Sequence, residues 1–132
     1  MTRWVLIIGA VLAWIFGAMI LLAPGPFLAP IGIVVTDKIA AIAQTQGALL
    51  VGLGFINFLA RGSTDPVALR AVLVGNLVVQ LLSLGVAVRA VALGIFPPQG
   101  APSIVIHLVL AALFVLALRR VQAGSGPAAR GA

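Results

Sequence analysis

Among the polar side chains within the long apolar stretches of this sequence, six could do chemistry or bind a ligand, and their types decide what the chain offers. They are Gln46, Asn57, Asn76, Gln80, Ser83 and His107. Amides, a hydroxyl and an imidazole all hydrogen-bond to uncharged polar groups. A Ser–His nucleophile pair also needs an acid that orients the imidazole, and the two acidic residues, Asp37 and Asp65, stand outside the apolar stretches. The residue types therefore favour ligand binding or helix contact over catalysis.

The composition places these side chains in a membrane protein. Hydrophobic residues make up 63% of the 132 residues and charged residues 8%, whereas an average soluble protein has about 25% charged residues. The formal net charge of +6 comes from scattered basic residues, so we expect no nucleic-acid partner. The chain has no cysteine and one histidine, which excludes thiolate metal sites and two-histidine haem ligation within one chain. We predict no metal site and no cofactor.

Four segments have the roughly 20 apolar residues that a helix needs to cross the hydrocarbon core of a membrane. They are residues 5–23, 39–60, 66–90 and 102–118. Asp65 followed by Pro66 is typical of a helix start, and Asp37 precedes the second span in a similar way. The sequence thus predicts an all-α, four-transmembrane-helix up-down bundle over residues 1–121.

Two further segments do not fit a span. Residues 24–38 contain prolines at positions 24, 26 and 30, which forbid a continuous helix. Within this segment, residues 31–35 are apolar but too few to cross the membrane, and we expect them to lie at the membrane interface or to tuck against the bundle. Residues 122–132 are rich in Gly, Ala, Ser and Pro, and we expect them to form a disordered cytoplasmic tail.

Basic residues are unevenly divided between the two ends of such a bundle. The end with the N-terminus, the 61–66 turn and the C-terminus holds Arg3, Arg61, Arg70, Arg119, Arg120 and Arg130. The opposite end holds Lys38 and Arg89. Because cytoplasmic segments of membrane proteins carry an excess of Lys and Arg, we predict that both termini are cytoplasmic.

Small residues recur at four-residue spacing in the first two spans and predict where these helices touch. Each face has three members: Gly9, Ala13 and Gly17 in the first span, and Gln44, Ala48 and Gly52 in the second. Helices in lipid associate through close packing, for which small residues make room. We therefore predict that these two faces pack against each other.

The six polar side chains fall at two depths in the predicted membrane. Gln46 and Asn57 are eleven residues apart and point the same way to within about 20° at 100° per residue. A rise of about 1.5 Å per residue gives an outer layer of Gln46, Gln80, Ser83 and His107 and an inner layer of Asn57 and Asn76. The outer layer either lines a small cavity that binds a lipid-like head group or only bridges helices. The inner layer is predicted to be an interhelical contact.

Residues 46–61, QGALLVGLGFINFLAR, resemble the second span of small four-helix bacterial membrane proteins of the DoxX-like group. The resemblance covers this helix and the four-span layout. It implies a multi-pass protein of the bacterial inner membrane and, for some members, an accessory role beside quinone-linked redox enzymes. It carries no catalytic or cofactor-binding residue onto this sequence.

These observations together favour a non-enzymatic function. We expect an accessory or scaffold subunit, or a free-standing bundle that binds a lipid-like molecule. Its partners would be membrane lipids, other membrane subunits or further copies of the chain. Two alternatives are a membrane subunit of a quinone-linked oxidoreductase, with His107 and Gln80 hydrogen-bonded to the quinone, and a small oligomeric transporter.

Overall fold

A computed structural model describes residues 1–124 of the chain. Over these residues it contains helices and no strand, and four helices are long and apolar enough to cross a membrane. The elements are α1 (Thr2–Leu22), α2 (Pro24–Leu28), the 3₁₀ turn η1 (Ala29–Ile31), α3 (Asp37–Ala60), α4 (Pro66–Ala92), the 3₁₀ turn η2 (Pro98–Gly100) and α5 (Pro102–Gly124). The predicted fold class, an all-α four-helix bundle, is confirmed.

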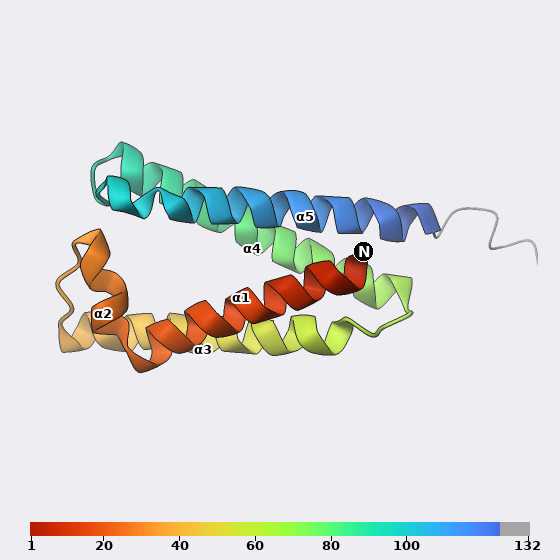
Figure 1. The fold of residues 1–132 in the computed structure, drawn as a ribbon, viewed down its shortest axis with the longest axis horizontal. Coiled ribbons are helices and arrows are strands. Elements are labelled where there is room, and N and C mark those ends of the chain that lie inside the picture. Colours follow the sequence, from red (N-terminus) through yellow and green to blue (C-terminus); the bar gives the residue numbers. More distant parts are fainter. Residues whose placement is uncertain (125–132) are drawn as a thin grey trace, which may run out of the picture.

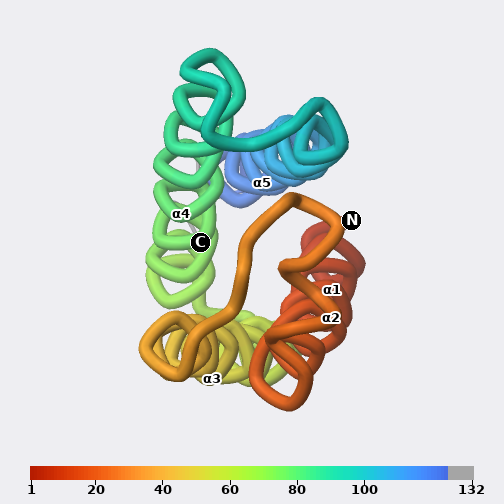
Figure 2. The backbone as a smooth tube through the Cα atoms, turned by 90° about the vertical axis from the view of Figure 1, so that its left-hand side faces the viewer, coloured from red at the N-terminus to blue at the C-terminus, as the bar shows by residue number. Residues whose placement is uncertain are grey.

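The four long helices run in alternating directions along one axis (Figure 1). The N-terminus, the turn between α3 and α4 and the end of α5 lie at one end, called here the termini side; α2, η1 and η2 lie at the other end, the loop side. Helix α1 packs on α3, and α4 packs on α5, and these two pairs contact each other less extensively. Figure 2 looks along the bundle from the loop side and shows the α2–η1 segment crossing this end.

Short polar signals set the starts of α3 and α4. Thr36 caps α3, because its hydroxyl accepts a hydrogen bond from the Ile39 N–H, and Asp37 lies inside the first turn. The helix therefore begins at Asp37, whereas Asp37 was expected to stand just before the helix. Asp65 caps α4 as predicted, and its carboxylate accepts from the Val67 N–H at 2.9 Å.

Helix α5 continues to Gly124, beyond the predicted end of the fourth span at Leu118. Arg119 and Arg120 end the apolar stretch, but arginine is a good helix former and does not end the helix. The tail predicted to be disordered from residue 122 is therefore helical at residues 122–124. The remainder of that prediction, residues 125–132, lies outside the described residues.

The apolar core lies in the termini-side half of the bundle and joins α1, α4 and α5. It consists of Val5, Leu6, Leu73, Leu110, Phe114 and Ala117. The outward faces of the helices are also apolar: Ile42, Leu59 and Leu82 are 72%, 74% and 68% exposed. An apolar outer surface of this extent fits a protein that is surrounded by lipid.

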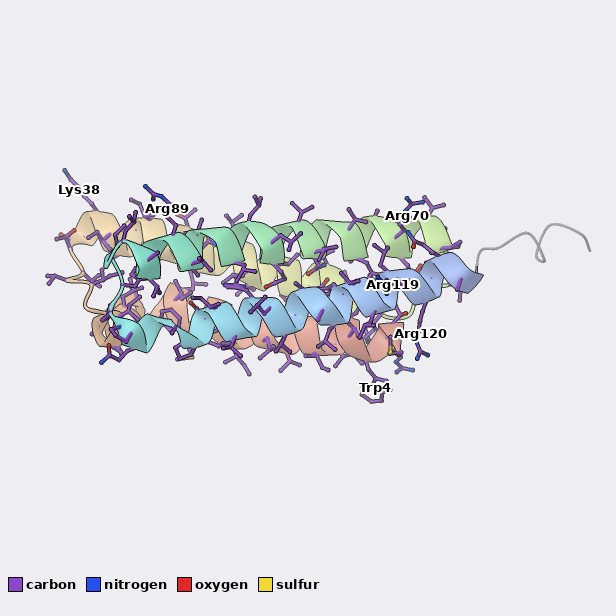
Figure 3. All side chains as sticks on the ribbon, turned by 90° about the horizontal axis from the view of Figure 1, so that it is seen from above. Trp4, Lys38, Arg70, Arg89, Arg119 and Arg120 are labelled. Atoms are coloured by element: carbon purple, nitrogen blue, oxygen red, sulfur yellow. The ribbon has the colours of Figure 1, made fainter. Side chains whose placement is uncertain are left out.

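Basic side chains gather at the two ends of the bundle and leave its middle free of charge over the described residues (Figure 3). Arg70, Arg119 and Arg120 lie at the termini side, whereas Lys38 and Arg89 lie at the loop side. This is the division that the sequence predicts, except that Arg130 lies outside the described residues. The bundle axis is therefore the direction in which the helices would cross a membrane.

Two glycines of α3 bring its backbone against α1. A Cβ atom added to Gly47 would lie 2.6 Å from the Leu21 nitrogen and 2.7 Å from the Gly17 oxygen. A Cβ atom on Gly54 would overlap the Trp14 indole, which also packs on the rings of two α3 phenylalanines at centroid distances of 5.2 Å. The close contact between α1 and α3 therefore depends on glycine at these positions.

The packing face predicted for α3 was wrong at Ala48 and Gly52, although the pairing of α1 with α3 and the contacts of Gly17 and Gln44 are as predicted. Ala48 is exposed, and a Cβ atom on Gly52 would have no described atom within 4 Å. The helix carries small residues on two faces, and the contact uses Gly47 and Gly54 instead. Spacing alone does not tell which of two small faces meets the partner helix.

Candidate functional site

A cavity of about 220 Å³ lies between the two helix pairs, from the middle of the bundle toward the loop side. Each helix supplies part of its wall, for example Ile20 of α1, Phe27 of α2, Leu53 of α3, Gln80 of α4 and His107 of α5. The wall is mostly apolar, and the cavity is partly open to its surroundings. A cavity of about 150 Å³ holds a benzene molecule, so this one can hold a substituted six-membered ring.

His107 and Gln80 form a polar pair in this wall and connect α5 to α4. The Nδ1 atom of His107 lies 2.7 Å from the Oε1 atom of Gln80. An amide oxygen only accepts hydrogen bonds, so Nδ1 carries the proton and donates. In the uncharged imidazole, Nε2 is then an acceptor.

Two nitrogen atoms of this pair, His107 Nε2 and Gln80 Nε2, make no hydrogen bond within the described part of the chain. Neither atom is fully buried. Among residues 1–124, Trp14 Nε1 is the one fully buried side-chain nitrogen or oxygen that has no hydrogen-bond partner. Both His107 and Gln80 line the cavity. The pair thus has one acceptor and one donor without a partner among the described residues, on two residues that line the cavity.

Asn57 and Asn76 form the second polar pair, and they use their amides on each other. Asn57 Nδ2 donates to Asn76 Oδ1 at 2.9 Å, and Asn76 Nδ2 donates to Asn57 Oδ1 at 2.6 Å and to the Val72 carbonyl at 2.9 Å. The two residues are 1% and 2% exposed. The interhelical contact predicted for this pair is present, and it links α3 to α4 at the termini-side end of the cavity.

Breaking this amide pair on one side is expected to cost more than removing it altogether. Asn57→Leu leaves the Asn76 amide buried without its partner, and we expect a loss of about 1–2 kcal/mol in the free energy of unfolding. The double variant Asn57→Leu/Asn76→Leu should be less destabilised than either single variant, because no buried amide is then left without its partner. Reversible unfolding in mixed micelles with increasing dodecyl sulfate measures the three values. Strict additivity would contradict a direct contact.

The structure does not bring the whole predicted outer layer together. Gln46 is exposed and lies one helical turn beyond Leu50, which lines the cavity. Ser83 is half-buried and is not part of the cavity wall. Of the four residues, Gln80 and His107 alone meet in the cavity. The rise per residue predicts how deep a side chain lies in the membrane. It does not predict which side chains meet, because that also depends on the tilt of each helix and on its rotation relative to its neighbours.

Gly9 and Ala13 of α1 lie at the cavity as well as on the face of the helix that was predicted to pack. A Cβ atom on Gly9 would lie 3.1 Å from Phe114 Cζ and 3.2 Å from Asn57 Nδ2, so this glycine makes room for both side chains. Ala13 is 8% exposed and lines the cavity. The small-residue face of α1 therefore serves the interior of the bundle and not only its contact with α3.

Two residues near the loop side were missed by the sequence reasoning. Phe27 of α2 and Ser103 of α5 both line the cavity, and the Ser103 hydroxyl donates to the Gly100 carbonyl at 2.7 Å. Gln44, which was predicted to lie on the α3 face toward α1, does contact that helix: its Nε2 donates to the Leu21 carbonyl at 3.1 Å and satisfies one of the free carbonyls at the end of α1. Nothing in the spacing indicated that the α2 segment would reach the cavity.

Comparison of the chain with protein-family models, with curated proteins and with solved structures found no match. The resemblance of residues 46–61 to DoxX-like proteins therefore stays a prediction.

Proposed function

We propose that this small multi-pass membrane protein binds a lipid-like molecule in the cavity between its two helix pairs and does so without catalysing a reaction. The observation that carries the proposal is the His107–Gln80 pair: both residues line a mostly apolar cavity, and each keeps a side-chain nitrogen atom without a partner among the described residues. A polar group without a partner is costly in the interior of a membrane. A bound molecule that pairs with these atoms would remove that cost.

The apolar lining and its place in the bundle favour a molecule that arrives from the lipid. No residue that lines the cavity in the described part of the chain is charged. The two helix pairs contact each other less extensively than the helices within each pair, so the cavity borders the looser of the packing contacts. The ring-sized volume is too small for a whole membrane lipid. The head of the molecule would occupy the cavity and its chain would extend into the bilayer.

In this proposal the protein lies in the bacterial inner membrane with both termini in the cytoplasm. The support is the excess of arginine at the termini side, where Figure 3 shows Arg70, Arg119 and Arg120. Basic residues near span ends favour the cytoplasmic side. The cavity would then lie in the half of the membrane that faces away from the cytoplasm.

Filling the cavity is expected to abolish ligand retention. In Ala13→Phe a phenyl ring would project from the cavity wall into the space that the ligand needs. The matched control is Ala112→Phe, because Ala112 of α5 is exposed on the outside of the bundle. Both variants would be purified in mild detergent, and the lipids that remain bound would be extracted and identified by mass spectrometry.

The expected result is a lipid species retained by the original chain and by Ala112→Phe, and reduced at least tenfold in Ala13→Phe. Circular dichroism and gel filtration would show whether both variants keep the helical fold. A folded Ala13→Phe variant that retains the same lipid in the same amount would overturn the proposal. So would a wild-type chain that retains no lipid at all.

A further inference from the structure

We infer that the head of the bound molecule is a neutral, phenol-like ring that carries a hydroxyl group. This inference rests on the proposed function, and it names the chemical class of the ligand. It starts from the two free nitrogen atoms of the polar pair. Gln80 Nε2 is a donor, and His107 Nε2 is an acceptor when Nδ1 donates to Gln80 Oε1.

A hydroxyl group satisfies both atoms because it accepts and donates. Its oxygen would accept from Gln80 Nε2, and its hydrogen would be donated to His107 Nε2. A carbonyl or ether oxygen can only accept, so it would leave the imidazole nitrogen unpaired. The hydrogen-bond pattern of the pair therefore distinguishes a hydroxyl from these groups.

Charged head groups do not fit the wall of this cavity. A phosphate or sulfonate is held in proteins mainly by Arg, by Lys or by several backbone N–H groups. The described residues that line the cavity include no Arg or Lys that would pair with an anion and no Asp or Glu that would pair with a cation. A charge inside a membrane is costly without such partners. The head group is therefore neutral.

Aromatic side chains favour a ring over a flexible chain end. Phe16, Phe27 and Phe114 all line the cavity, and the first two meet edge to face with ring centroids 6.3 Å apart. Aromatic rings attract one another in edge-to-face and offset arrangements. The volume of about 220 Å³ accommodates one substituted six-membered ring. A phenol-like head thus matches the cavity in size, wall and hydrogen bonding.

Matched probes test this inference on the full chain after its lipids have been removed in detergent. The probes are 4-dodecylphenol, its methyl ether 4-dodecylanisole and the anion 4-dodecylbenzenesulfonate, and native mass spectrometry measures their binding. We expect the phenol to bind at least tenfold more tightly than the ether and the sulfonate. In His107→Phe the preference for the phenol over the ether should fall to about one, because its hydrogen-bond acceptor is gone.

The outcomes separate the inference from the proposed function. If the ether or the sulfonate binds as tightly as the phenol, and Ala13→Phe weakens that binding, the hydroxyl head is wrong and the cavity still binds a ligand. If no probe responds to Ala13→Phe, the proposed function itself fails. The phenol-to-ether ratio of the unaltered chain tests the inference even where His107→Phe does not fold.

Discussion

Replacing Gly47 with leucine is expected to force α1 and α3 apart and to destabilise the bundle by about 3 kcal/mol. The added Cβ would lie 2.6 Å from the Leu21 nitrogen and 2.7 Å from the Gly17 oxygen. Both are backbone atoms, so no side-chain rotation relieves the overlap. Because the α1–α3 contact holds one of the two helix pairs together, its loss should affect the whole bundle. Unfolding in dodecyl sulfate mixed micelles, followed by circular dichroism, measures the change.

The matched control is Gly52→Leu on the same helix. A Cβ atom on Gly52 would meet no described atom within 4 Å, so the leucine would point away from α1. We expect its free energy of unfolding to stay within about 0.5 kcal/mol of the unaltered chain. Equal destabilisation by the two substitutions would mean that the effect comes from losing glycine and not from the contact with α1.

This pair of glycines also shows how far the sequence predicts the structure. The spans and their antiparallel order follow from the length of the apolar stretches, which a membrane of fixed thickness constrains strongly. The rotation of α3 about its own axis is a weaker signal, because glycines at 47, 52 and 54 cover more than one face. The face that contacts α1 is chosen by complementary shape, with Trp14 seated over Gly54. That complementarity depends on two helices, so the residue spacing within one helix does not predict it.

The candidate site was predicted only in part, because it too depends on how several helices pack together. Gln80 and His107 meet because their depths and their helix faces agree, whereas Gln46 agrees in depth alone. Phe27 reaches the cavity from a proline-rich segment whose path depends on where α1 ends and how α3 begins. Apolar spans fix the layout of the bundle, and interhelical packing fixes the cavity.

The core and the cavity adjoin each other, Leu110 and Phe114 belong to both, and the larger of these two side chains is Phe114. It is 1% exposed, it is a member of the termini-side core, and its ring lines the cavity. It also connects the two helix pairs, because it extends from α5 to Gly9 of α1. The packing of this ring therefore links the stability of the bundle to the shape of the cavity.

Phe114→Ala is expected to lower the free energy of unfolding by about 3 kcal/mol, since it removes a buried ring and leaves a void. The control on the same helix is Leu116→Ala, because Leu116 is 48% exposed and its loss should change stability by less than about 0.5 kcal/mol. The same mixed-micelle unfolding applies to both variants. A small effect at Phe114 would mean that the ring does not pack between the helix pairs.

A size exchange between α1 and α5 tests the contact directly. In Gly9→Ala the new methyl group would lie 3.1 Å from Phe114 Cζ, which is tighter than an ordinary contact. Leucine at position 114 lacks the atom that the methyl group approaches, so Gly9→Ala and Phe114→Leu should compensate each other. We expect the double variant to be more stable than the sum of the two single effects by about 1 kcal/mol. Independent effects would show that the two helix pairs do not meet at these residues, and the cavity between them would then have a different wall.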